Sequence, residues 1–172
     1  MRRVVTGHTP DGKSTIASDT ELDVISIAPI LEFYKIWGAD EAPTFPDDGS
    51  PPAYSMYFPP VGGFRYVIFT LPPESVVQPE KGGLDLLLDE LEKEMPGAIK
   101  YQEKDSPGMH TTDTIDFEYI ISGDVWLELD DGKEVHLQAG DTVIQNGTRH
   151  AWHNKGSEPC SMVICLIGAH RK

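Results

Sequence analysis

Residues 116–168 read DFEYIISGDVWLELDDGKEVHLQAGDTVIQNGTRHAWHNKGSEPCSMVICLIG, a run of short apolar segments broken by turns. The segments are rich in β-branched and aromatic residues, and Gly, Asp and Asn gather between them. Many short strands at such regular spacing are typical of an antiparallel sandwich or barrel. The pattern predicts six strands, at 117–122, 125–129, 134–138, 142–145, 150–154 and 160–168.

The rest of the chain predicts one further clear strand and one helix. Residues 64–71 (FRYVIFTL) have strand composition and end at two prolines. Helical spacing and an apolar stripe are shared by Leu84, Leu87, Leu88, Leu91 and Met95. We expect this helix to pack on a sheet, with a lid over a site as the alternative. The predicted fold is mainly β: an extension of short strands and loops over 1–62, and a barrel over 63–172 with a helical insertion at 82–97.

The charge of the chain excludes some partners. Its 172 residues carry 14 Lys and Arg against 28 Asp and Glu, a net charge of -14. Phosphate binding needs clustered Lys and Arg, so we expect neither a nucleic acid nor an anionic membrane surface as partner. A hydrophobic content of 39% fits one globular domain.

The cysteines and the first residues bear on location. Cys160 and Cys165 lie five residues apart, which places them on opposite faces of one strand and prevents a bridge between them. No long apolar run follows Arg2 and Arg3, so the chain start does not read as a secretory signal. Both observations predict a cytoplasmic protein.

One motif has the letters of a nucleotide site without its context. Residues 7–14 (GHTPDGKS) match the phosphate-binding loop pattern. That loop needs a helix after it, whose N-terminus faces the phosphates. The residues after Ser14 are β-branched and polar with no helical stripe, and Pro10-Asp11-Gly12 is typical of a hairpin turn. We therefore predict a hairpin here.

Histidines and acids gather in two blocks of the barrel region. His110, Thr112, Asp116 and Glu118 are separated by even numbers of residues, so they would share one face of a single strand. The second block runs from Gly140-Asp141 through Gly147 to His150 on another β pattern. Histidine and carboxylate side chains are the usual ligands of catalytic metals and the usual carriers of protons.

The two blocks resemble the motifs of the cupin superfamily, the RmlC-like jelly rolls. The first cupin motif has a glycine, His-x-His, a glutamate and a later glycine, and here Asp116 stands seven residues before Gly123, at the glutamate place. The second motif resembles Gly140 to His150. The likeness spans about residues 105–168 and is closest to a subgroup of small bacterial and fungal single-cupin proteins. It implies a jelly-roll barrel that holds a small molecule.

The resemblance also implies a metal site with one departure. Thr112 occupies the place of the second histidine, which leaves His110, Asp116 and His150 as a two-histidine, one-carboxylate set for iron, manganese, nickel or zinc. In the alternative, the metal site has decayed and no metal is bound. Glu118 could restore a ligand or act as a catalytic base. Thr112 and Gln145 are the expected substrate contacts.

Two functions remain open from the sequence. The first is an enzyme acting on a small organic acid or aromatic compound, of the decarboxylase, dehydratase, isomerase or dioxygenase type, with a metal or with His and Asp moving protons. The second is a small-ligand-binding cupin without turnover. A homodimer is expected in either case, because the N-terminal extension would add strands to its own barrel or to a partner's.

Overall fold

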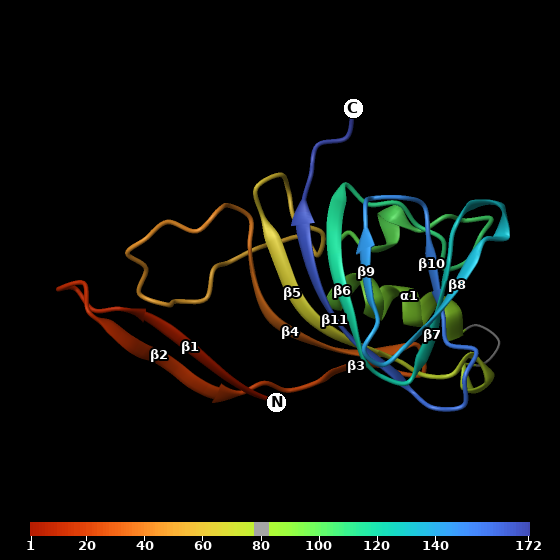
Figure 1. Cartoon of the computed structure of the whole chain (residues 1–172), viewed down its shortest axis with the longest axis horizontal. Coiled ribbons are helices and arrows are strands. Elements are labelled where there is room, and N and C mark those ends of the chain that lie inside the picture. The colour runs from red at the N-terminus through yellow and green to blue at the C-terminus, as the bar shows by residue number, and fades with distance from the viewer. Residues whose placement is uncertain (78–82) are drawn as a thin grey trace.

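The computed structural model describes residues 1–77 and 83–172 and is mainly β, with two antiparallel sheets facing each other across a common interior (Figure 1). The six-stranded sheet has the order β3 (Ile25–Ile27), β4 (Leu31–Ala39), β5 (Phe64–Leu71), β11 (Cys160–Gly168), β6 (Thr114–Ser122) and β9 (Thr142–Gln145). The three-stranded sheet has the order β10 (Ala151–His153), β7 (Asp124–Glu128) and β8 (Glu134–Gln138). The predicted β-barrel architecture is confirmed.

The predicted strands appear with small changes at their ends. The strands at 64–71, 134–138, 142–145 and 160–168 have the predicted bounds, whereas β6 begins earlier and β10 is shorter than expected. Gly123 makes the turn between β6 and β7 at a φ of +76°, and a Cβ there would lie 2.5 Å from the carbonyl oxygen of Pro159. Only glycine fits such a turn without strain.

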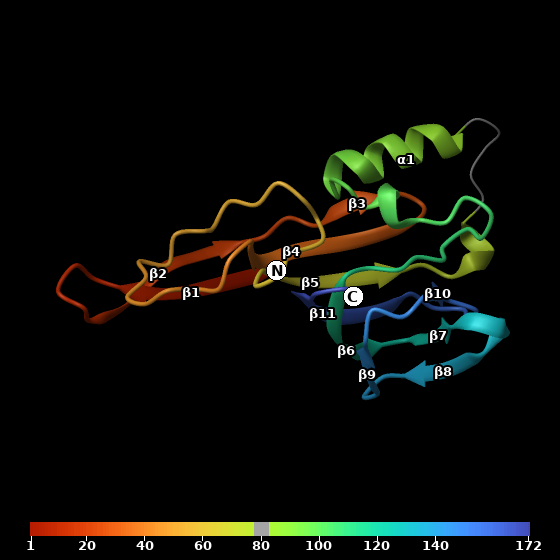
Figure 2. The same ribbon diagram turned by 90° about the horizontal axis from the view of Figure 1, so that it is seen from above.

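The predicted helix is α1 (Gly83–Glu94), which lies beside β3 and β4 (Figure 2). The expected beginning of the insertion at residue 82 lies outside the described residues. Leu87 and Leu91 pack against the core next to Met95, which is 6% exposed. The helix thus packs on the sheet through its apolar stripe. Three short 3-10 helices complete the described helices, at Glu74–Val76, Ile99–Tyr101 and Asp130–Gly132, and none of the described helices has the length and apolar character to cross a bilayer.

The N-terminal hairpin projects from the barrel as an arm formed by β1 (Arg2–His8) and β2 (Ser14–Glu21) (Figure 1). Its turn runs through Pro10-Asp11-Gly12, and the amide of Thr9 donates to the carbonyl oxygen of Lys13 at 2.8 Å. A strand, not a helix, follows Ser14, so the predicted hairpin is confirmed and the phosphate-loop geometry is absent from this segment.

A buried arginine ties the segment before β5 to the barrel. Arg65 lies on the inner face of β5, is 0% exposed and ion-pairs with Asp40. Its guanidinium also donates to the carbonyl oxygens of Tyr57, Ala39, Phe64 and Met56 at 2.7–3.0 Å. A charge so deeply buried is tolerated only with this many partners. Arg65 therefore fixes where Tyr57 and its neighbours enter the barrel.

Candidate functional site

Strand β6 directs polar side chains into the barrel. Thr114, Asp116 and Glu118 alternate along its inner face and are each at most 4% exposed. Thr112, just before the strand, is 1% exposed. The even spacing in the sequence correctly predicted that Asp116 and Glu118 share a face, whereas Thr112 lies in the irregular residues just before the strand. The regular strand does not extend back to His110, because residues 111–113 are irregular.

His110 instead pairs directly with His150. The two residues exchange backbone hydrogen bonds of 2.9 and 3.0 Å, and their ring centroids lie 4.2 Å apart at 50°. An isolated β-bridge thus brings together the first histidine of one motif and the histidine of the other. This pairing was expected from the two motifs, whereas the bridge that produces it was not.

The two rings are held in the same tautomer. The Nδ1 atom of each ring lies 2.9 Å from a backbone carbonyl oxygen, that of Gly108 for His110 and that of Thr148 for His150. A carbonyl oxygen only accepts, so Nδ1 carries the proton and Nε2 presents a lone pair. Burial, and then the charge of His110, lower the pKa of His150 to about 4. Burial lowers the pKa of His110 as well, against the effects of Gly108 and Glu103. Both rings are therefore neutral at neutral pH.

A second cluster lies deeper, around Tyr57, Asp116 and Glu118. Each side chain has a buried polar atom with no hydrogen-bond partner in the protein: the Tyr57 hydroxyl, Asp116 Oδ1 and Glu118 Oε2. Burial, and then the charge of Asp116, raise the pKa of Glu118 to about 8. Burial raises the pKa of Asp116 to about 6, against the opposite effect of the Thr114 hydroxyl. At neutral pH Glu118 is a proton donor and Asp116 is mostly ionised.

Tyr57 is a site residue that the sequence did not reveal. It is 4% exposed, and its pKa is raised well above the usual value by burial and then by the charge of Asp116. Phe58 and Phe69 hold its ring through edge contacts at centroid distances of 5.0 and 6.2 Å. Tyr57 sits in a loop almost sixty residues before β6, so no periodicity links it to Asp116. The nearest signal is Arg65, whose place in the strand alternation indicates a buried charge that needs partners.

Thr112 and Gln145, the two predicted substrate contacts, are buried and form hydrogen bonds within the protein. The Thr112 and Thr114 hydroxyls lie 2.8 Å apart, and Gln145, which is 3% exposed, donates from Nε2 to the carbonyl oxygen of Thr148 at 3.3 Å. Gln145 also stands opposite Asp116 across the β6–β9 ladder. Their roles as substrate contacts stay predictions.

The expected metal ligands form a pair and not a set of three. No group of three or more His, Cys, Asp or Glu side chains within 1–77 and 83–172 is gathered closely enough to hold a metal ion. His110 and His150 have the tautomer that a metal ligand needs, with Nδ1 bonded outward and Nε2 free. Burial is the largest cause of the lowered pKa of each histidine, and the β6 carboxyls are not among the causes. As arranged, these residues do not fit a metal held by three protein ligands, and the ligand set stays a prediction.

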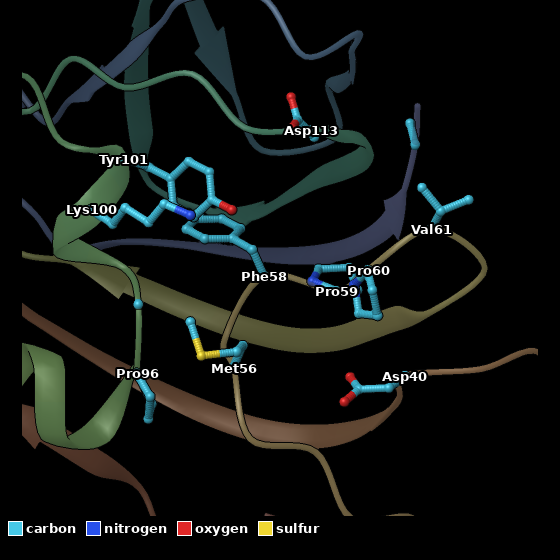
Figure 3. A pocket seen from close by; sticks show the side chains of 12 residues that line it. Asp40, Met56, Phe58, Pro59, Pro60, Val61, Pro96, Lys100, Tyr101 and Asp113 are labelled. Atoms are coloured by element: carbon cyan, nitrogen blue, oxygen red, sulfur yellow. The ribbon is translucent and has the colours of Figure 1, made fainter. Parts of the chain in front are cut away.

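Two surface hollows lie away from these clusters. The larger, of about 470 Å³, lies between the loop at 56–61 and the segment after α1, where the rings of Phe58 and Tyr101 meet at 4.8 Å (Figure 3). Its two carboxylates, Asp40 and Asp113, are paired with Arg65 and Arg171. The smaller, of about 370 Å³, lies beside the C-terminal residues and is lined in part by Thr112 and Thr114. The paired histidines, Asp116 and Glu118 line neither of these two hollows.

Comparisons with known proteins give the family. A family model described as a cupin domain matches residues 98–167. "Oryzines biosynthesis cluster protein J" of Aspergillus oryzae is 36% identical over 56 residues, which cover 33% of this chain and 31% of that protein. The "Cupin-domain-containing oxidoreductase virC" of Hypocrea virens is 32% identical over 62 residues, which cover 34% of this chain and 32% of that protein. The chain thus matches about a third of the length of these curated relatives.

A solved structure extends the likeness to the fold of nearly the whole chain. The cupin domain of Cnp3 from Schizosaccharomyces pombe superimposes with a TM-score of 0.50 at 8% identity, covering 97% of this chain and 87% of that one. At that identity the likeness concerns the fold alone. The family match includes both histidines and both buried acids. Residues 98–167 therefore match a cupin domain, and the chain has a cupin fold.

Proposed function

We propose that the protein is an enzyme that binds a small organic acid or aromatic compound inside the barrel and moves protons on it. The observation that carries the proposal is the cluster of three buried polar atoms, on Tyr57, Asp116 and Glu118, whose hydrogen-bonding capacity the protein leaves unmet. Burying such groups without partners costs about 1–3 kcal/mol each. A polar ligand that bonded to them would recover that free energy, so their arrangement favours ligand binding.

The residues supply both an acid and a base for this chemistry. Burial and the charge of Asp116 raise the pKa of Glu118 to about 8, so its carboxyl group can donate a proton at pH 7. The Nε2 atoms of His110 and His150 are unprotonated and can accept one. Environments that separate the pKa values of neighbouring groups in this way are typical of acid–base sites. Dehydration and isomerisation can proceed by such proton transfers. Decarboxylation also breaks a C–C bond, and the electron pair left on carbon when CO₂ departs must be stabilised by the substrate before Glu118 protonates that carbon.

The relatives support a small molecule as substrate. Two of them are named as members of fungal biosynthesis clusters, for oryzines and for phomopsin, and a third as an oxidoreductase. The family model matches residues 98–167, which include Asp116 and Glu118 but not Tyr57. Free Cys160 and Cys165 support the predicted cytoplasmic location.

A second candidate is a cupin that binds a ligand without turnover. It is favoured by the departure from the cupin motif, since Thr112 stands in the place of the second histidine and its hydroxyl pairs with that of Thr114. The metal content of the purified protein distinguishes a metal-dependent enzyme from a protein that binds no metal. One equivalent of iron, manganese, nickel or zinc per chain, lost in His110→Ala and His150→Ala, would support the metal-dependent enzyme.

The test is a screen of small carboxylic acids and phenols against the purified protein, with ligand-induced thermal shift and product analysis as readouts. We expect a compound that stabilises the wild type and is converted. In Glu118→Gln we expect binding to be retained and turnover to fall by about 10²–10⁴-fold. Glu134→Gln, which changes an exposed carboxylate on β8, is the matched control and should behave as wild type.

The outcomes separate the candidates. Binding without conversion in the wild type would favour the non-catalytic cupin. Conversion that Glu118→Gln leaves intact would contradict the role assigned to Glu118. If no compound stabilises the wild type more than it stabilises the triple variant Tyr57→Phe, Asp116→Asn, Glu118→Gln, the barrel interior is not the binding site.

A further inference from the structure

The larger surface hollow, here called the aromatic hollow, lies between two segments that are far apart in the sequence. These are the loop at 56–61 and residues 96–101, which follow α1 (Figure 3). A backbone hydrogen bond joins them, because the amide of Tyr57 donates to the carbonyl oxygen of Pro96 at 2.8 Å. Arg65 fixes the loop from the barrel side by donating to two of its carbonyl oxygens. One side of the aromatic hollow is therefore anchored to the core.

Glu92 fixes the other side of the aromatic hollow. Its carboxylate accepts from the amide of Gly97 at 2.6 Å and from that of Ile99 at 3.3 Å. These bonds hold the chain in place as it leaves α1. A hollow with both sides fixed keeps its shape before a ligand arrives, and sites for small molecules are usually preformed in this way.

The walls of the aromatic hollow are apolar and aromatic. The rings of Phe58 and Tyr101 meet edge to face at a centroid distance of 4.8 Å, and the Tyr101 hydroxyl points into the hollow (Figure 3). Much of the remaining wall is formed by Met56, Pro59, Pro60 and Pro96. Aromatic and methionine side chains pack well against an aromatic ring. The volume of about 470 Å³ suits one small molecule.

The charges around the aromatic hollow are complementary to a single carboxylate. Its two acidic residues, Asp40 and Asp113, are already paired with arginine side chains. Lys100 is exposed, and its Nζ atom lies 5.4 Å from the centroid of the Tyr101 ring. No acidic side chain within residues 1–77 and 83–172 forms an ion pair with Lys100. The aromatic hollow thus offers a free cation beside an aromatic wall.

Phe58 separates the aromatic hollow from the buried cluster inside the barrel. Its ring contacts that of Tyr101 on the hollow side and that of Tyr57, at a centroid distance of 5.0 Å, on the barrel side. Asp116 and Glu118 do not line the hollow. A ligand in the aromatic hollow and a ligand in the barrel would therefore contact different polar groups, and the two sites can be tested separately.

We propose that the aromatic hollow is a second ligand site, which binds a small aromatic carboxylate with its ring against Phe58 and Tyr101 and its carboxylate at Lys100. The ammonium group of Lys100 donates charge-assisted hydrogen bonds to the carboxylate, and the Tyr101 hydroxyl is a further donor. A polyanion would need clustered cations, whereas one free lysine matches one negative charge. This site goes beyond the acid–base chemistry proposed for the barrel interior and does not depend on it.

The test is a titration of the labelled protein with phenylacetate and with its uncharged analogue phenylacetamide, followed by amide NMR. The wild type should bind the acid more tightly than the amide. Lys100→Met should weaken phenylacetate binding by about two- to fivefold, as expected for one exposed ion pair, and leave phenylacetamide binding unchanged. Tyr101→Leu removes part of the aromatic wall and should weaken the binding of both compounds by about two- to tenfold.

Lys104→Met is the matched control for Lys100→Met. It removes the same charge from another exposed lysine, which does not line the aromatic hollow, and should bind both compounds as the wild type does. An effect of Lys104→Met as large as that of Lys100→Met would overturn the proposal. So would a wild type that binds phenylacetamide as tightly as phenylacetate, or that binds neither compound at millimolar concentration.

The amides that shift in the wild type locate the ligand independently of these variants. Phenylacetate should shift the amides at 56–58 and 97–101, and its affinity should be the same in the triple variant Tyr57→Phe, Asp116→Asn, Glu118→Gln. Shifts confined to the barrel strands, or a loss of binding in the triple variant, would place the ligand inside the barrel and overturn the proposal. A protein that binds phenylacetate in this way but converts no substrate would contradict only the enzyme proposed above.

Discussion

The two faces of strand β6 invert the usual pattern of a barrel wall. Its inner face carries Thr114, Asp116 and Glu118, all nearly inaccessible, whereas its outer face carries Phe117 and Tyr119, both nearly half exposed. Its neighbour β11 is apolar on both faces. A barrel that only needed to fold would place the apolar face inward. The requirements of folding do not by themselves explain this inversion.

The inner and the outer face of β6 each carry a cost in free energy, and the two costs have different origins. Buried polar atoms without protein partners destabilise the empty barrel, and an exposed apolar face destabilises the isolated chain in water. A ligand inside the barrel would remove the first of these costs and leave the second unchanged. Substitutions on one face of β6 can therefore change the cost carried by that face and leave the cost of the other face unchanged.

The largest expected effect on the free energy of unfolding comes from replacing Arg65, a buried side chain on the inner face of β5. Arg65→Met should lower the free energy of unfolding by about 3–5 kcal/mol, because it leaves four buried carbonyl oxygens and Asp40 without their donor. Arg65→Lys keeps the charge but loses most of the donors, so an intermediate loss is expected. Urea denaturation followed by circular dichroism measures both.

The matched change for Arg65→Met is Arg2→Met on the arm. Arg2 makes a two-pronged pair with Asp19 in full contact with solvent, and such pairs contribute little. A loss in Arg65→Met no larger than that in Arg2→Met would show that the inner-face arginine is dispensable.

The second largest expected effect is a fall in the free energy of unfolding between pH 6.5 and 8. Burial and the charge of Asp116 raise the pKa of Glu118 from 4.5 to about 8, so the folded protein binds this proton more tightly than the unfolded chain. The free energy of unfolding then falls as the pH rises through that window. Below pH 6.5 the lowered pKa of His150 acts in the opposite direction, since the unfolded chain binds that proton more tightly. Between pH 6.5 and 8 we expect a net loss of about 1–2 kcal/mol in urea denaturation.

Glu118→Gln is the control for this pH dependence. It preserves the shape of the inner face but cannot ionise, so its stability should be flat between pH 6.5 and 8. A wild type with no loss in that range, or a Glu118→Gln variant with the same loss, would assign the titration to another group.

The smallest effects compare two tyrosine hydroxyls on opposite sides of the sheet. Tyr57→Phe removes a buried hydroxyl that has no protein partner, so the free energy of unfolding should stay unchanged or rise by about 1 kcal/mol. Tyr119→Phe on the outer face should change it by less than about 0.5 kcal/mol. Thermal denaturation of both variants would show this. A clear loss in Tyr57→Phe would reveal a partner for its hydroxyl.

Much of the barrel could be predicted because its strands are short, separated by Gly and Asp turns and rich in β-branched residues. The predicted bounds of β5, β9 and β11 hold to the residue. β3 was not predicted, because Ile25–Ile27 is three residues long and carries no periodic signal. Its pairing with β4 and its contact with α1 make it a strand.

Two site residues could be predicted to lie together only where both belong to the two cupin-like motifs of the sequence. Parity placed Asp116 and Glu118 inward, and the motif resemblance linked His110 to His150. The roles of Tyr57 and Arg65 were not predicted, because their proximity to β6 comes from long-range packing that no local pattern encodes. His110 and Asp116 do not lie on one strand, because the irregular residues 111–113 separate them, and the metal-ligand set stays a prediction.

The projecting arm makes the molecule behave in solution as a larger particle than its mass implies. The β1–β2 hairpin extends the long dimension of the chain without adding much volume (Figure 1). Friction depends on that dimension, so a single chain diffuses slowly and elutes early from a sizing column. Shape and mass are thus separate observables for this protein.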